Sequence, residues 1–159
     1  MLWKVLIVGM GNVLMADDGL GVWALYELDR KYRHRDGVCL LEVGTSILSY
    51  IAEIGKAENL IAIDAITAGN HPGTIYRISF DYTDTADYQY FARNCHGASL
   101  HEAMALSREL TGLPSKAFIY GIEPLAIKEG FYISQVVKTS LNRLLDIVQR
   151  DVDAILRKE

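Results

Sequence analysis

The sequence predicts an α/β fold, a single domain with an open, mostly parallel, twisted sheet of about five strands and helices on both faces. Short apolar runs alternate along the chain with longer segments of helical periodicity. This alternation is typical of parallel sheets whose crossovers are helices. The length of 159 residues fits one domain, expected over residues 1–159. With 50% hydrophobic and 23% charged residues, the composition excludes wholesale disorder.

Three strands are expected in the first half of the chain, each a short apolar run rich in Val, Ile and Leu. They are residues 5–8, 38–43 and 60–63. The runs over residues 5–8 and 60–63 are continuously apolar, which is typical of buried strands in a parallel sheet, and residues 38–43 are expected to form a strand that ends at Gly44. Between them, residues 20–32 have the apolar period of a helix, and Thr45 or Ser46 can cap a second helix that Gly55 ends.

The second half is expected to add two strands and two helices. Residues 74–80 alternate between apolar and polar side chains, as an edge strand with one solvated face does. Residues 81–94 are polar and aromatic without a clear period, and we expect a long loop there. A helix over residues 96–110, a strand over 117–122 and a long amphipathic helix over 134–157 complete the chain.

The expected order of elements places the loops that follow strands at one edge of the sheet, because parallel crossovers are right-handed. We expect the first three strands to lie in the order 2-1-3. The loop after the first strand then neighbours the end of the third strand. Ligands of such folds bind at this carboxyl edge, near the switch in strand order.

Three polar residues fall at this edge and are candidate catalytic and metal-binding residues. Asp18 lies in the loop after the first strand, Asp64 ends the third strand and His96 begins the third helix. Two carboxylates and an imidazole suit zinc or another divalent transition metal. Each residue also has a structural interpretation, as a helix cap, an acceptor of backbone amides or a residue that begins a helix. Asp64 follows four apolar residues, and because burying an unpaired carboxylate is costly, it needs a partner, a metal or water.

Two other chemistries are disfavoured by the pattern of residues. Gly9 and Gly11 follow the first strand as in a dinucleotide-binding fingerprint, but Leu14 stands where that motif has a third Gly or Ala. Cys95 and His96 are adjacent, so a thiol nucleophile and its base would not face each other on a helix or a strand.

Net charge, hydropathy and the number of cysteines predict which partners the protein lacks and where it is located. The net charge of −4 gives no basic footprint for phosphates, so no nucleic-acid partner is expected. No apolar stretch reaches the roughly 18 residues of a membrane span, so no membrane association is expected. Two cysteines do not provide a disulfide framework, and we expect a reduced, cytoplasmic protein.

Five motifs occur in order along the chain. The first is GMGNVLMADDGLG over residues 9–21, after the first strand. The others are Gly44-Thr45, Asp64-Ala65-Ile66, His96 at the start of the third helix, and Gly121-Ile122-x-Pro124 followed by Gly130 and Ser134. With these motifs, nearly the whole chain resembles the nickel–iron hydrogenase maturation endopeptidases. These proteases remove the C-terminal extension of the hydrogenase large subunit.

The resemblance implies a site and a partner. The residues of the family that contact metal correspond to Asp18, Asp64 and His96, although the neighbouring Asp17 is an alternative to Asp18. The implied partner is the precursor of a nickel–iron hydrogenase large subunit. The implied metal is nickel that the precursor already carries, so no permanently bound cofactor is expected. Nickel would act either as a recognition handle that positions the scissile bond or as a Lewis acid.

Two rival functions remain open from the residues alone. One is a free-standing metallohydrolase that holds its own zinc through the same side chains. The other is a non-catalytic, doubly wound module that binds nucleotides. The fold class does not separate them, since such sheets support many functions.

Overall fold

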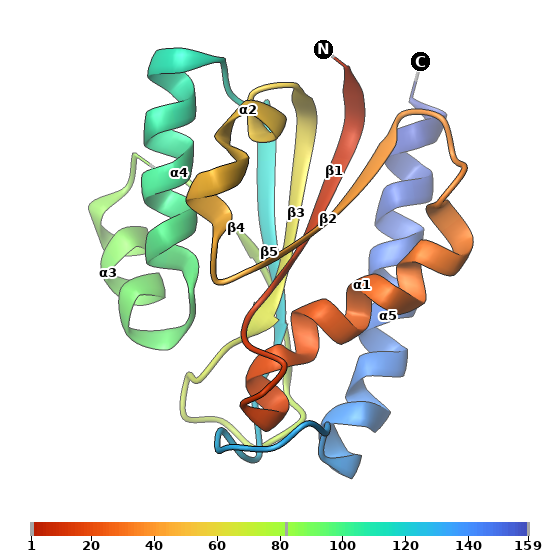
Figure 1. Ribbon diagram of the computed structural model, residues 1–159, viewed down its shortest axis with the longest axis vertical. Coiled ribbons are helices and arrows are strands. Elements are labelled where there is room, and N and C mark those ends of the chain that lie inside the picture. The colour runs from red at the N-terminus through yellow and green to blue at the C-terminus, as the bar shows by residue number, and fades with distance from the viewer. Residues whose placement is uncertain (1, 82, 159) are drawn as a thin grey trace.

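Residues 2–81 and 83–158 are described by the computed structural model, in which five strands form one sheet (Figure 1). The strands are β1 (Trp3–Met10), β2 (Val38–Gly44), β3 (Ala57–Ala65), β4 (Ile75–Ser79) and β5 (Lys116–Ile122). Their order across the sheet is β2-β1-β3-β5-β4, and only β4 runs antiparallel to its neighbour. The expected α/β class, the 2-1-3 order and the edge position of β4 are therefore confirmed.

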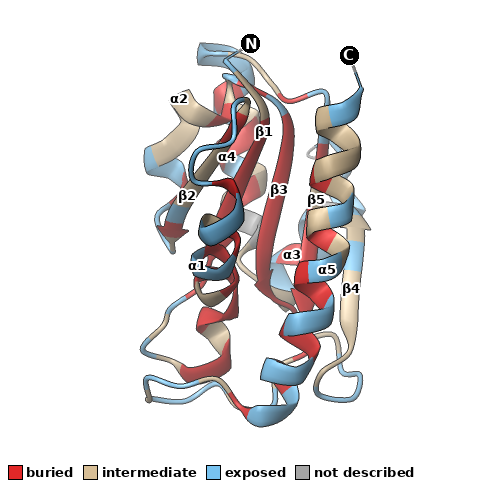
Figure 2. Ribbon diagram, turned by 90° about the vertical axis from the view of Figure 1, so that its right-hand side faces the viewer, coloured by how far each residue is buried: buried red, intermediate tan, exposed pale blue. Residues whose placement is uncertain are grey.

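Helices cover both faces of this sheet (Figures 1 and 2). The helices are α1 (Leu20–Tyr32), α2 (Ile51–Ile54), α3 (Thr85–Asn94), α4 (Gly97–Leu110) and α5 (Gln135–Arg157). Val5 and Ile7 of β1 pack in the hydrophobic cluster that contains α1 and α5, whereas Leu6 and Val8 pack in the cluster of α2 and α4. Because alternate side chains of a strand point to opposite faces, both sides of β1 are buried, as its continuous apolar run predicts.

Two elements differ from the sequence expectation. Residues 81–94 contain helix α3 rather than a long loop. Asp84 caps this helix, since its carboxylate accepts a hydrogen bond from the Ala86 amide at 2.8 Å. Phe91 is buried, but several other side chains of α3 are exposed. Because few side chains of α3 face the core, the apolar period of this helix is weak in the sequence.

The expected helix after Ser46 is divided into a 3₁₀ turn, Ile47–Tyr50, and the short helix α2. Ser46, one of the two expected capping residues, does precede this turn, but its side chain makes no capping hydrogen bond there. Gly55 follows the helix as expected. Among residues 2–81 and 83–158, no helix combines the length and the hydropathy needed to cross a bilayer.

Candidate active site

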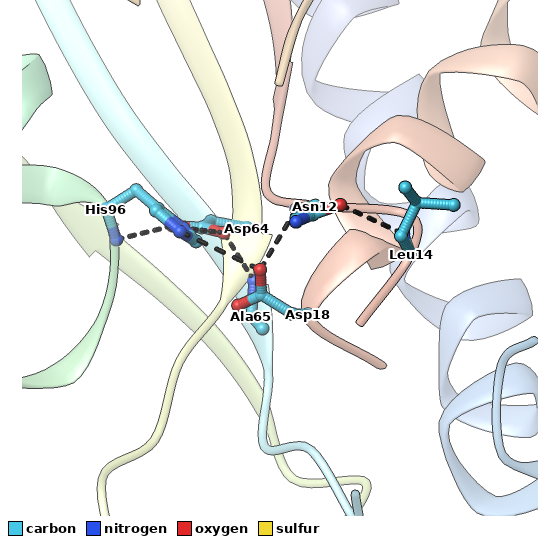
Figure 3. A network of polar contacts seen from close by, with 6 residues as sticks. All are labelled: Asn12, Leu14, Asp18, Asp64, Ala65 and His96. Carbon is cyan, nitrogen blue, oxygen red and sulfur yellow. Dashed lines mark hydrogen bonds and ion pairs between the residues drawn. The ribbon is translucent and has the colours of Figure 1, made fainter. Parts of the chain in front are cut away.

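The three candidate residues come together at the carboxyl edge of the sheet (Figure 3). Asp64 is the last residue but one of β3. Asp18 lies in a 3₁₀ turn, Ala16–Gly19, that follows the neighbouring strand β1. His96 immediately precedes α4. The adjacency of β1 and β3, expected from the order of the elements, is what brings the two carboxylates near each other.

Asp64 holds His96 by both its backbone and its ring. One carboxylate oxygen of Asp64 accepts a hydrogen bond from the backbone amide of His96 at 2.8 Å. The Nδ1 atom of His96 lies 3.0 and 3.1 Å from the two carboxylate oxygens. The amide of Ala65 donates to Asp64 at 2.9 Å. Asp64 is 1% exposed, so these donors are the partners that a buried carboxylate requires.

Asp18 lies on the other side of the imidazole ring. Its Oδ2 atom is 3.7 Å from Nε2 of His96 and accepts a hydrogen bond from the Asn12 amide at 2.9 Å. The Asn12 side chain accepts a hydrogen bond from the amide of Leu14 and so stabilises the same loop. The side chains of Asp18 and His96 are 16% and 29% exposed, so solvent reaches the site on this side.

The two carboxylates favour a protonated imidazole in the metal-free protein. The hydrogen bond to Asp64 is the main cause that raises the pKa of His96 to about 9, and Asp18 adds to it. Burial raises the pKa of the Asp64 carboxyl, and His96 opposes this effect. A proton is therefore held tightly between the imidazole and the carboxylates, and a cation that binds Nε2 must displace it.

Asp17, the alternative to Asp18, points to a different part of the molecule. It is fully buried, and its carboxylate accepts hydrogen bonds from the amides of Leu125, Ala126 and Ser134 at 3.0, 3.1 and 2.7 Å. The Ser134 hydroxyl donates a further bond at 2.8 Å. These donors satisfy both oxygens of the Asp17 carboxylate. The geometry therefore favours Asp18 as the residue that acts at His96.

Two glycines allow the loop after β1 to approach the site. Gly11 has a φ of +106°, and a Cβ atom there would lie 1.9 Å from the carbonyl oxygen of Asp18. A Cβ atom on Gly21 would lie 2.0 Å from the carbonyl oxygen of Ile63. Gly11 therefore lets the loop pass close to the backbone of Asp18, and Gly21 lets α1 pack directly on β3.

The sequence interpretation missed Glu123, a buried carboxylate on the loop that follows β5. It accepts hydrogen bonds from the amides of Ala68 and Gly69 at 2.9 and 3.0 Å and from the Tyr76 hydroxyl at 2.7 Å. These contacts fix the loop that leaves β3 just after Asp64. The signal was an acidic residue directly after an apolar strand, the same signal that singled out Asp64.

Within the described part of the chain, no three His, Cys, Asp or Glu side chains already form a group able to hold a metal ion. At this site the Asp64–His96 hydrogen bond occupies Nδ1 of the ring, and Nε2 and the Asp18 carboxylate lie on the partly exposed side. Imidazole and carboxylate donors suit nickel as well as zinc. Direct contact of all three side chains with one cation requires the ring to release Asp64.

Comparison with known proteins identifies a family. The sequence model of the family described as hydrogenase maturation protease matches residues 22–151. This range contains Asp64 and His96, whereas Asp18 lies before it. The hydrogenase expression/formation protein HoxM of Cupriavidus necator is 31% identical over 155 residues, which cover 96% of this chain and 74% of that protein.

Two solved structures share the fold. The hydrogenase maturating endopeptidase HybD from E. coli superposes with a TM-score of 0.81 at 22% identity, over 95% of this chain and 93% of that one. The nickel–iron hydrogenase maturation protease HybD from Thermococcus kodakarensis gives a TM-score of 0.73 at 26% identity, over 92% and 97% of the two chains. The chain therefore belongs to the hydrogenase maturation protease family.

Proposed function

We propose that this protease removes the C-terminal extension of a nickel–iron hydrogenase large-subunit precursor that already carries nickel. The observation that supports the proposal is the meeting of Asp18, Asp64 and His96 at the carboxyl edge, in a chain of the maturation protease family. The proposed location of the reaction is the cytoplasm, since the two cysteines do not suggest a disulfide framework.

The proposed role of the cluster is to contact the nickel of the precursor. His96 Nε2 and Asp18 are partly exposed and are the first donors that an incoming cation meets. Asp64 holds the opposite side of the ring, as carboxylates behind metal-binding histidines do. Asp64 contacts the nickel directly once the ring releases Nδ1. The nickel enters and leaves with the substrate, so no resident cofactor is part of the proposal.

Cleavage adds one water molecule across the peptide bond near the nickel. The carboxylate of Asp18 is the better candidate for a general base, because it is partly exposed and makes one hydrogen bond to the loop. Both oxygens of Asp64 are already engaged by His96 and Ala65. Nickel contributes by positioning the scissile bond, by polarising its carbonyl group, or by both.

The test incubates purified precursor, with and without nickel, with the protease. Cleavage is measured as the decrease in the mass of the precursor when its C-terminal extension is removed. We expect the wild-type protease to cut only the nickel-loaded precursor. We expect Asp64→Asn and His96→Ala to abolish cleavage while circular dichroism stays unchanged. His71→Ala and Asp36→Asn are matched controls, since both residues are exposed and lie in other loops. Normal processing by Asp64→Asn and His96→Ala contradicts the site, and ready cleavage of nickel-free precursor contradicts the recognition of nickel.

A further inference from the structure

Two loops at the carboxyl edge expose large apolar side chains next to the candidate active site. Leu14, in the loop between β1 and α1, is 62% exposed. The loop between β5 and α5 exposes Leu125, Ile127 and Phe131 by 60%, 48% and 66%. We call these four side chains the apolar loop surface. Isolated exposed apolar residues are common, but a group of them on adjoining loops marks a site of interaction.

The backbones of the two loops are joined to each other. Met15 and Gly130 form a parallel β-bridge, and the Ala16 amide donates to the Gly130 carbonyl at 2.8 Å. In the opposite direction, the Gly130 amide donates to the Leu14 carbonyl at 2.9 Å. Figure 1 shows both loops at the same end of the molecule, beyond the carboxyl ends of the strands. The apolar loop surface is therefore a connected structure.

Asp17 fixes this structure from the inside. Its buried carboxylate accepts hydrogen bonds from Leu125, Ala126 and Ser134, so it holds both ends of the β5–α5 loop. Ala16 beside it has a φ of +51°, a conformation that costs free energy for a residue with a Cβ atom. The buried charge of Asp17 and the strained backbone of Ala16 thus hold the exposed apolar side chains in a fixed arrangement. A loop that is ordered before binding loses less conformational entropy when a partner binds, which favours binding.

A cavity of about 320 Å³ lies beside the apolar loop surface. Trp23, Tyr132 and Leu141 line it between α1 and α5. The Phe131 ring packs on the Trp23 ring with 5.2 Å between their centroids, so the exposed surface continues into this cavity.

We propose that the apolar loop surface docks an apolar segment of the polypeptide substrate, close to the bond that is cut. The proposal rests on the proposed function, which requires a polypeptide to reach Asp18. The surface and the site share one structural element, since the turn Ala16–Gly19 carries both Asp17, which holds the β5–α5 loop, and Asp18, which faces His96. Binding energy from segments away from the scissile bond is what positions a large substrate.

The test compares two kinds of variant in cleavage of nickel-loaded precursor. Leu125→Ser together with Ile127→Ser removes two apolar side chains of the surface. Leu110→Ser is the matched control, because Leu110 is 64% exposed at the opposite end of α4. We expect the double variant to raise KM by about tenfold or more, because it removes two apolar side chains that docking of the substrate would bury. We expect kcat to change by less than about twofold, and the control to match the wild type.

A second measurement detects contact directly. A photo-crosslinking amino acid at position 125 is expected to capture the precursor, whereas the same group at position 110 is not. This result does not depend on cleavage, so it reports docking separately from catalysis.

Three outcomes overturn the proposal in different ways. Unchanged KM in the double variant, with no cross-link from position 125, removes the docking surface and leaves the proposed function standing. In a second outcome, the wild-type protein elutes as a dimer, whereas the double variant elutes as a monomer and its KM is unchanged. These results would show that a second copy of the chain covers the surface. A wild-type protein that fails to cut nickel-loaded precursor removes the proposed function and this proposal with it.

Discussion

Asp17 and Asp64 are both buried carboxylates at the carboxyl edge of the sheet, but their surroundings differ. Asp17 is surrounded by backbone amides and one hydroxyl, which hold their hydrogens at any ordinary pH. Asp64 shares its oxygens between two amides and the His96 ring, whose other nitrogen faces solvent and Asp18. A carboxylate that is saturated by fixed donors serves the fold, whereas one paired with a titratable ring is available for chemistry.

The adjacent pair Asp17 and Asp18 gives the sharpest test of this difference, because the same substitution falls on neighbouring positions. We expect Asp18→Asn to lower the rate of precursor cleavage by about 10²–10⁴-fold, the usual effect of losing a general acid or base. Its free energy of unfolding should change by less than about 0.5 kcal/mol, since an amide oxygen can still accept from Asn12. Cleavage assays and urea unfolding measure the two effects, and a large loss of stability would contradict the division between the residues.

Asp17→Asn should show the opposite balance. Its amide group would place a donor among the donors of Leu125, Ala126 and Ser134. We expect the free energy of unfolding to fall by about 3 kcal/mol, as for the loss of a buried, charge-assisted network. Urea unfolding at neutral pH measures this loss, with Asp36→Asn as the exposed control. A stability equal to that of the control would show that the network around Asp17 contributes little to the fold.

The titration of His96 tests whether Asp64 is paired with the imidazole ring. In the metal-free protein its pKa is about 9, raised from 6.5 mainly by Asp64. Because the folded state holds this proton more tightly than the unfolded state, the stabilisation is complete below pH 6.5 and is lost as the pH rises through about 9. NMR of the imidazole should show this titration, and Asp64→Asn should return it toward 6.5. A wild-type titration near the ordinary value would mean that Asp64 does not hold the ring in solution.

Tyr76→Phe should have the smallest effect. The Tyr76 hydroxyl is one of the donors to Glu123, and the amides of Ala68 and Gly69 remain. We expect the free energy of unfolding to fall by about 1 kcal/mol and the rate of cleavage to stay unchanged. Chemical unfolding and the cleavage assay check both expectations. A strong loss of cleavage would instead mean that this network controls the position of Asp64.

The parts of the fold that the sequence predicted are those with strong, local patterns. The runs of β1 and β3 are apolar on both faces, so their burial follows from composition, whereas β2 lies at the edge of the sheet and exposes Glu42. The meeting of Asp18 and Asp64 followed from strand order, because neighbouring parallel strands end at one edge.

The parts that it did not predict depend on contacts between distant segments. Nothing local distinguishes Asp17 from Asp18, since their roles depend on Ser134 and His96, which lie far along the chain. Helix α3 was missed because its stability comes from packing against α4 and from the Asp84 cap rather than from a clear apolar period. The role of Glu123 could not be predicted from its position after an apolar strand, because its amide partners lie in another loop.

The bond between Asp17 and Ser134 has a consequence for synthesis of the protein. A chain emerging from the ribosome makes residue 18 early, but the turn that presents it gains its anchor only when residue 134 has been translated. The two acidic neighbours are therefore completed at different stages, since the bond of Asp18 to Asn12 is local whereas the bonds of Asp17 need the far end of the β5–α5 loop.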